Sequence, residues 1–418
     1  MIKKFIFSIF LFFGMIPTLA NASTGSLVKI GNNYYETLNA AIKNAGPNDT
    51  ISLISDVKLD ETLEINKSVN INLNGNDITA KENVFLVEGG TLNITGKGTI
   101  KETNPNYGAI MLKGSTNPSD NDYSVLKVGK DVTLEGWSGI FITHNNSKSY
   151  GVNVDFAGKI NSVNDASGGT GVGIYINGKI KDKENSPVVN ILDGAKITST
   201  GNGLYIAGYG TYNINEANIE GVESGIGIKS GILNIDGATI KGTGPDSTPT
   251  EGYNNGIKAS GTALQIESNN GYAGNIEINL DSGNFISNNS NVVYEYIGKG
   301  THSQVTALNV SGGTFKSNKN KDVFRLSDSL KEYHNSFISG GKYSSDPSIH
   351  LKPGYSVTVR DDSFEVTKTT MKEAIGNNIK EGTSRNNTKT IVIITIISLT
   401  LLLAAYLNRT KILNLIRN

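Results

Sequence analysis

Residues 191–240 read ILDGAKITSTGNGLYIAGYGTYNINEANIEGVESGIGIKSGILNIDGATI, and one short unit occurs in them three times. Each copy places a polar or small four-residue turn between two apolar residues. The copies are Leu192-DGAK-Ile197, Ile214-NEAN-Ile219 and Ile235-DGAT-Ile240, and they begin 22 and 21 residues apart. A constant spacing of this kind indicates a repeat architecture.

The same unit continues toward the C-terminus at wider intervals. It reads Leu280-DSGN-Phe285, Val310-SGGT-Phe315 and Ile338-SGGK-Tyr343, after intervals of 45, 30 and 28 residues. We interpret the interval of 45 residues as two rungs, and the other two intervals as one rung plus a loop.

A second pattern, Gly-apolar-x-apolar, alternates with the first. Its copies are Gly139–Ile142, Gly173–Ile176, Gly203–Ile206 and Gly225–Ile228, with Gly256-Ile257 and residues 291–297 as candidate continuations. Each repeat therefore contains two or three short strands, separated by Gly, Asn or Asp residues that accept the backbone conformations of tight turns.

Such short strands need partners above and below them, and these are supplied when rungs stack in register. Side chains alternate between the two faces of a strand, so stacking would place Ile, Val and Leu in one continuous core. The sequence therefore predicts an all-β fold, a right-handed parallel β-helix. An antiparallel sandwich is the alternative, and it would require longer strands joined by hairpins.

Asparagine recurs beside the first unit, and we expect its side chains to form hydrogen-bonded ladders between rungs. A ligand-binding row is the alternative interpretation. The residues concerned are Asn93, Asn190, Asn213, Asn234, Asn279 and Asn309.

Both ends of the solenoid are expected to be capped, because open sheet ends recruit other chains. Residues 35–46 show helical spacing of apolar residues and end at Gly46, which predicts a short N-terminal helix. Residues 354–360 and 363–367 flank Asp361-Asp362 and predict a C-terminal hairpin.

The chain termini predict export and tethering. Residues 1–22 combine two lysines, an apolar run and Ala20-Asn-Ala22, as in a cleaved signal peptide. Residues 390–407, TIVIITIISLTLLLAAYL, carry no charge and predict a transmembrane helix. The basic residues after it predict that the tail, residues 408–418, is cytoplasmic.

The predicted topology therefore places residues 23–367 outside a bacterial cell membrane as a β-helix, on a flexible polar stalk formed by residues 368–389. Residues 372–389 contain no LPxTG-like sorting motif, so a membrane anchor is preferred to wall attachment. The chain has no cysteine, and its stability must come from burial and hydrogen bonding.

Charge argues against nucleic acid as a partner. The two terminal segments hold six basic residues and no acidic ones, so the middle of the chain carries a net charge of about −6. Nucleic-acid binding requires clustered Lys and Arg.

Two stretches resemble the adhesin-like family of bacterial surface proteins with a pectin-lyase-like β-helix. The opening, YYETLNAAIKNAGPNDTISLISDVKL followed by TLEINKSVNINLNGNDIT, is similar to their first rungs. The ending, FISGGKYSSDPSIHLKPGYSVTVRDDSFEV, is similar to their last rung. The resemblance covers roughly residues 33–100 and 305–367 and implies fold and surface location; this fold hosts both enzymes and adhesins.

No catalytic constellation is found in the sequence. A calcium-dependent lyase would need acidic ligands on one face with an Arg or Lys base, but Asp193, Asp236 and Asp281 occupy the turn of the repeat. A row of calcium ions at these residues is the alternative interpretation, and no other cofactor is expected. The four histidines, His144, His302, His334 and His350, share no metal-ligand spacing.

Aromatic residues are the remaining candidates for ligand contact, because exposed rings stack on sugars and anchor protein interfaces. We select Trp137, Tyr150, Tyr253 and Tyr272, which lie in or near expected loops. Packing against a neighbouring rung is the alternative role for Trp137. The excursions near residues 114–124, 243–255 and 267–275 are the best places for binding.

These observations favour a membrane-tethered, non-enzymatic adhesin or interaction scaffold whose partner is a glycan or a protein of a host or neighbouring cell. A surface-anchored polysaccharide lyase or glycoside hydrolase is the alternative. A structural role in the envelope is a third hypothesis.

Overall fold

The computed structural model describes Gly25 and residues 27–118, 121–143, 150–178, 180, 183–248 and 260–369. The predicted signal peptide, transmembrane segment and cytoplasmic tail lie outside these residues, as do Tyr253 and nearly all of the predicted stalk. Within the described ranges, no helix has the length and apolar character needed to cross a membrane.

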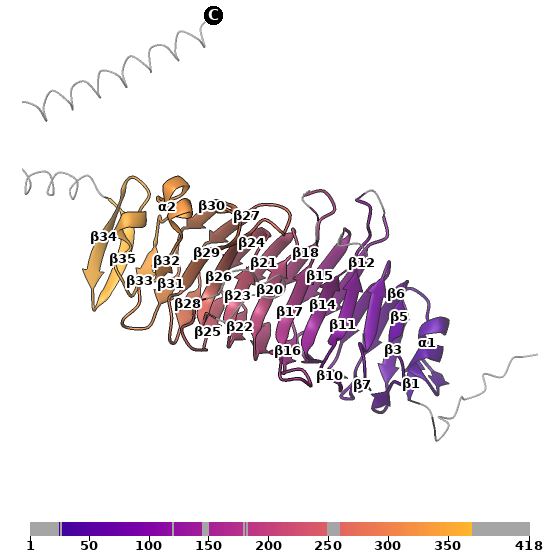
Figure 1. Cartoon of the computed structure of the whole chain (residues 1–418). Coiled ribbons are helices and arrows are strands. Elements are labelled where there is room, and N and C mark those ends of the chain that lie inside the picture. Colours follow the sequence, from indigo (N-terminus) through magenta and orange to yellow (C-terminus); the bar gives the residue numbers. More distant parts are fainter. Residues whose placement is uncertain are drawn as a thin grey trace, which may run out of the picture.

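The described residues form a parallel β-helix in which each rung adds one strand to each of three sheets (Figure 1). Sheet A begins with the antiparallel pair β1 and β2, and its strands from β3 onward are parallel. In spatial order it contains β2 (Asn33–Tyr35), β1 (Val28–Ile30), β3 (Thr50–Leu53), β6 (Ser68–Asn72), β9 (Thr91–Thr95), β12 (Ser124–Val128), β15 (Val152–Phe156), β18 (Val188–Ile191), β21 (Thr211–Asn215), β24 (Gly231–Asp236), β27 (Ile276–Leu280) and β30 (Val305–Val310).

Sheet B follows sheet A along the chain in each rung and ends in the antiparallel strands β35 and β34. It contains β4 (Val57–Lys58), β7 (Ile78–Ala80), β10 (Gly98–Glu102), β13 (Val132–Gly136), β16 (Lys159–Ser162), β19 (Lys196–Ser199), β22 (Asn218–Gly221), β25 (Thr239–Gly242), β28 (Asn284–Ser287), β31 (Thr314–Lys316), β33 (Gly341–Tyr343), β35 (Ser363–Lys368) and β34 (Tyr355–Arg360).

Sheet C completes each rung, and four of its strands carry the four copies of the Gly-apolar-x-apolar pattern, whereas Gly256-Ile257 lies outside the described residues. It contains β5 (Leu63–Ile65), β8 (Phe85–Glu88), β11 (Gly108–Lys113), β14 (Ser138–Thr143), β17 (Val172–Asn177), β20 (Asn202–Ala207), β23 (Ser224–Ile228), β26 (Thr262–Asn269), β29 (Val293–Lys299) and β32 (Phe324–Arg325). The prediction of a parallel β-helix is therefore confirmed.

The interpretation of the 45-residue interval as two rungs is wrong. β24 pairs directly with β27, with Ile235 opposite Leu280, so the interval is a single rung. The extra residues belong to the eight-residue strand β26 and to the connections on either side of it. Sequence spacing counts these connections, whereas they add no rise along the solenoid axis. Residues 267–269, expected in an excursion, are likewise the end of β26.

The core consists of columns of apolar side chains that repeat from rung to rung. One column in sheet B is almost completely buried and continues from isoleucine and leucine into stacked aromatic rings toward the C-terminus. Burial of each such side chain contributes roughly 1.5–3 kcal/mol. The column is Ile78, Ile100, Leu134, Ile160, Ile197, Ile219, Ile240, Phe285, Phe315 and Tyr343.

Both predicted caps are confirmed (Figure 1). Helix α1 (Leu38–Asn44) buries Leu38 and Ala41 at the first rungs, and the Thr37 hydroxyl caps it by accepting from the Ala40 amide at 3.1 Å. The hairpin of β34 and β35 covers the last rung through antiparallel pairing of β35 with β33. Helix α2 (Asp328–Tyr333) and the short 3-10 helix η2 (Ser348–His350) lie between β32 and this hairpin.

The predicted asparagine ladder is confirmed and lies on the outer face of sheet A. Each side chain donates from Nδ2 to Oδ1 of the asparagine on the preceding rung, at 2.8–3.0 Å along the main run. This run is Asn309, Asn279, Asn234, Asn213 and Asn190. A separate bond at 3.3 Å joins Asn93 to Asn70.

Opposite charges stand at the two ends of this run of asparagines. Asn190 donates to the Asp155 carboxylate at 2.9 Å, and the Lys352 ammonium donates to Oδ1 of Asn309 at 3.0 Å. The donor end of the aligned amides thus meets an anion, and the acceptor end meets a cation. Aligned hydrogen bonds polarise one another, so each terminal charge stabilises the run.

Replacement of Asn234 by alanine should lower the free energy of unfolding by about 1–3 kcal/mol, because it removes one bond to Asn213 and one from Asn279. The control is Asn215→Ala, at an exposed position of β21. This substitution should change the free energy of unfolding by less than about 0.5 kcal/mol. Urea denaturation of the full chain, followed by the fluorescence of its single tryptophan, measures both. Equal midpoints for the two variants would show that the ladder adds no stability.

Candidate functional site

The outer face of sheet C is bordered on both edges by long connections. Those entering sheet C include the segments after β16 and β25, and those leaving it include the segments after β11, β17 and β26. The turns from sheet A to sheet B are short, as between β18 and β19. Insertions on a solenoid gather around its binding face, so this arrangement selects sheet C.

A row of aromatic rings runs across this face on three consecutive rungs. Phe141 of β14, Tyr175 of β17 and Tyr205 of β20 occupy equivalent positions in the strand register. Their rings stack, with centroids 4.7 Å apart for the first pair and 4.8 Å for the second. Phe141 and Tyr175 are half-buried, whereas Tyr205 is buried. The row therefore offers ring edges to solvent at its N-terminal end.

Trp137 lies beside this row and packs against two of its rings. Its ring is tilted against Phe141 at 6.3 Å and against Tyr175 at 5.7 Å, and its Nε1 donates to the Thr170 carbonyl at 3.0 Å. Burial, together with nearby Tyr272, raises the pKa of Tyr175 to about 12, so its hydroxyl stays neutral at physiological pH. The cluster combines apolar ring surface with hydroxyl groups, which suits amphipathic ligands.

Toward the C-terminus the aromatic row gives way to buried polar groups. Lys229, which follows β23, forms an ion pair with Glu267 of β26 at 3.1 Å. Tyr272 covers this pair, with its ring centroid 4.7 Å from Lys229 Nζ, and its hydroxyl lies 3.2 Å from that of Tyr205. Tyr272 therefore connects the aromatic row to the charged pair.

Tyr150 holds together the border where sheet C leads into sheet A. Its side chain is 5% exposed and packs with Ile180 and Tyr209, and its backbone exchanges hydrogen bonds of 2.8 and 3.0 Å with Ser115. Tyr123 adds a second tie by donating to Asn185 at 2.7 Å. The described position of Tyr150 thus leaves little of its ring for ligand contact.

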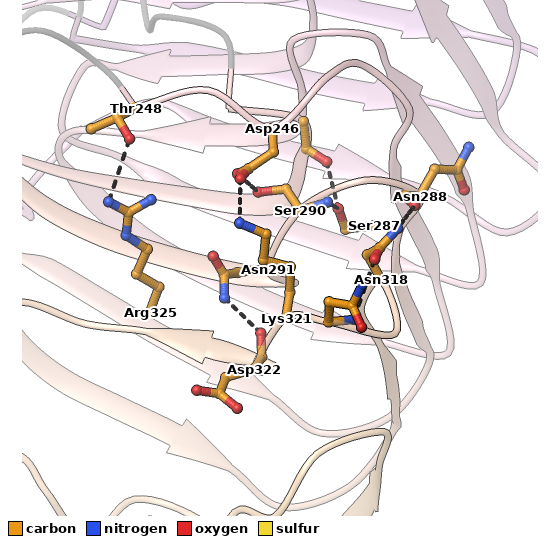
Figure 2. A network of polar contacts seen from close by, with 12 residues as sticks. Asp246, Thr248, Ser287, Asn288, Ser290, Asn291, Asn318, Lys321, Asp322 and Arg325 are labelled. Atoms are coloured by element: carbon orange, nitrogen blue, oxygen red, sulfur yellow. Dashed lines mark hydrogen bonds and ion pairs between the residues drawn. The ribbon is translucent and has the colours of Figure 1, made fainter.

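The opposite border is secured by the polar network in Figure 2. Asp246, in the connection after β25, accepts from Lys321 at 2.5 Å and from the Ser290 hydroxyl at 2.7 Å. Arg325 donates to Thr248 at 3.4 Å and lies 4.4 Å from the ring centroid of Tyr294. These bonds link the start of the longest connection to the last rungs of the solenoid.

Asp193 and Asp281 lie in the turns between sheets A and B, as predicted, whereas Asp236 is the last residue of β24, directly before its turn. Asp236 accepts from the Ser282 hydroxyl at 2.5 Å, and Asp281 accepts from the Ser311 hydroxyl at 2.7 Å. Each carboxylate thus ties its turn to the turn of the next rung. Among the residues that the structure describes, no group of three or more His, Asp or Glu side chains is placed to hold a metal ion.

Glu102 is an unusual buried acid close to Trp137. Its side chain is 2% exposed at the end of β10, where later rungs carry serines such as Ser162 and Ser199 that donate to backbone carbonyls. Neither carboxyl oxygen makes a well-directed hydrogen bond within the described residues. Burial raises the pKa of Glu102 to about 7, although the nearby amides of Tyr107, Asn104 and Trp137 act in the opposite direction.

We expect Glu102 to make stability depend on pH. Its folded-state pKa is raised above the ordinary value of a glutamate. Its contribution to the free energy of unfolding is therefore fully present below about pH 4.5 and is lost as the pH rises through about 7. Glu102→Gln should remove this dependence and become more stable than the wild type near pH 8, by at most about 3 kcal/mol. Urea denaturation of both chains at several pH values measures the difference.

The exposed Glu64→Gln is the matched control and should retain the wild-type pH dependence. If the free energies of unfolding of wild type and Glu102→Gln differed by the same amount at pH 4 and at pH 8, the raised pKa of Glu102 would be contradicted.

The structure brings together two of the four aromatic residues selected from the sequence. Trp137 and Tyr272 pack in one cluster with Tyr175 and Tyr205, whereas Tyr150 lies in another. Phe141, Tyr175 and Tyr205 were not selected, although each occupies the x position of the Gly-apolar-x-apolar pattern. The occurrence of an aromatic residue at x in three consecutive copies of the pattern is the sequence signal that could have identified them.

Comparison of the chain with protein-family models, with curated proteins and with solved structures found no match.

Proposed function

We propose that this protein is a non-enzymatic surface scaffold that binds a glycan on the outer face of sheet C. The observation that carries the proposal is the cluster of Trp137, Phe141 and Tyr175, whose half-buried rings lie side by side on consecutive rungs. Sugars present apolar C–H surface and hydroxyl groups together, and aromatic side chains with polar groups nearby recognise both.

The neighbouring row of sheet C supplies such polar groups. Thr143 and Asn177 follow Phe141 and Tyr175 by two residues on the same strands, and both are half-buried. Parallel stacking repeats the combination of a ring and a polar group from β14 to β17. A chain of repeating sugar units is the ligand class that best matches a surface with such a repeat.

Surface location is part of this proposal and is supported by the sequence of the two termini. A cleaved signal peptide and a transmembrane helix at residues 390–407 would hold the β-helix outside a bacterial membrane. The resemblance of both ends of the solenoid to adhesin-like proteins with a pectin-lyase-like fold agrees with this location. A surface-tethered lyase or hydrolase is the competing function.

We expect the full chain to bind at least one polysaccharide or oligosaccharide in a glycan array, and Trp137→Ala and Tyr175→Ala to weaken that binding roughly tenfold each. Loss of one stacked ring costs about 1–1.5 kcal/mol, which corresponds to this factor. Calorimetric titration with the best ligand from the array measures the affinities.

Tyr333→Ala, at an exposed aromatic position on α2, is the control and should bind as the wild type does. Binding that is equal in all three variants would move the ligand away from sheet C, and an array without any ligand would refute the proposal. Release of unsaturated or reducing sugars from the bound polysaccharide would establish the enzymatic alternative instead.

A further inference from the structure

Lys229 is the most deeply buried charged side chain near the proposed binding face. It follows Ile228, which pairs with Ile266, so it stands opposite Glu267 on the next rung. Its relative exposure is 0%, and the rings of Tyr272 and Tyr205 lie 4.7 and 5.8 Å from its Nζ. A lysine ammonium is strongly hydrated and normally lies at the surface, so the complete burial of Lys229 indicates a specific role.

Glu267 contacts both the amine of Lys229 and the side-chain amide of Asn269. Its Oε1 atom lies 3.1 Å from Lys229 Nζ and accepts a hydrogen bond of 2.7 Å from Asn269 Nδ2. Its Oε2 atom accepts from the Tyr296 hydroxyl at 2.7 Å. An amine and a carboxamide therefore share one carboxylate oxygen, in a site where Glu267 is 4% exposed and Asn269 is 3% exposed.

The backbone after β26 holds Asn269 in place and closes the site. The Gly271 amide donates to Oδ1 of Asn269 at 3.0 Å, and the Tyr272 amide donates to the Asn269 carbonyl at 2.9 Å. The second bond forms the turn that carries the Tyr272 ring over Lys229. The first bond polarises the side-chain carbonyl of Asn269, as an oxyanion-stabilising donor does.

The surroundings make the Lys229 ammonium easier to deprotonate than a solvent-exposed one. Desolvation lowers the pKa of Lys229, and the charge of Glu267 opposes this effect. The ammonium makes no well-directed hydrogen bond within the described residues, despite its short distance to Glu267. A buried ammonium without such bonds is costly, and transfer of its proton to the adjacent carboxylate neutralises both groups.

We propose that Lys229 and Asn269 are joined by an isopeptide bond, formed within the folded solenoid with Glu267 as the proton-transfer group. The Lys229 ammonium first gives a proton to Glu267, and the neutral amine attacks Cγ of Asn269. The Nζ–Cγ bond forms and the Cγ–Nδ2 bond breaks. Glu267 carries the two protons lost by Nζ to Nδ2, which leaves as ammonium, so the peptide loses the mass of one ammonia and no oxidant or reductant is required.

Such a bond would reinforce the rung that most needs it. It links the ends of β23 and β26, so it closes the rung that contains the longest connection, between β25 and β26. A covalent link across a long loop restricts the unfolded chain in the same way as a disulfide. The chain has no cysteine with which to form one. The proposal is independent of the ligand bound at sheet C.

Mass spectrometry of the full chain tests the proposal directly. We expect trypsin to leave the bond after Lys229 uncut, and tandem spectra to show this peptide joined to the one containing Asn269, with the mass of one ammonia missing. Cyclisation at Asn270-Gly271 also releases ammonia, but it leaves two separate peptides. Separate peptides with cleavage after Lys229 would overturn the proposal.

Variants assign the roles of the three residues. Glu267→Gln and Lys229→Met should yield separate peptides, whereas Asn269→Asp should still give the linked peptide, because water can leave in place of ammonia. Lys241→Met, on β25 of the same rung, and Asn279→Ala, on β27 of the next rung, are controls that should retain the link. A link that persists in Glu267→Gln at the wild-type level would refute the role of Glu267.

Discussion

In-register pairing of each strand with the same strand of the next rung is the constraint on which the rest of this structure depends. Parallel pairing sets every residue directly above its counterpart, so each position in the rung becomes a column along the axis. A column must then tolerate contact with copies of itself. Isoleucine does so by burial in the core, and asparagine does so because its side chain carries both a donor and an acceptor.

The same constraint explains why the outer face of sheet C differs along its length. Its central row begins with stacked rings at Phe141 and Tyr175, while the adjacent row carries Lys229 and then Glu267. Exposed positions tolerate like charges on consecutive rungs, as Lys159 and Lys196 show, but a buried charge in a column needs an opposite charge or a neutral group next to it. Lys229 has Ala207 before it and Glu267 after it, which satisfies this requirement.

Much of the fold could be predicted because each turn and strand in the repeat leaves a local signal. The Leu192 and Ile235 units, the helix after Thr37 and the turn at Asp361-Asp362 each follow from short-range chemistry. The length of a rung could not be predicted in this way, because loops that contribute no strand pairing lengthen the 45-residue interval. The cluster of Lys229, Glu267 and Asn269 also escaped prediction, since only the rung geometry brings Lys229 beside residues beyond that loop.

Burial of the ion pair between Lys229 and Glu267 is unfavourable for folding, unless the pair has a further role. Removing an ammonium and a carboxylate from water costs several kcal/mol per ion, and their attraction offsets this only when good hydrogen bonds complete the pair. Glu267 receives such bonds from Asn269 and Tyr296, whereas Lys229 makes no well-directed hydrogen bond with any residue that the structure describes. Apolar residues in place of both Lys229 and Glu267 would avoid that penalty. Conversion of the amine into an amide removes the buried positive charge, and it accounts for lysine at this position where simple packing does not.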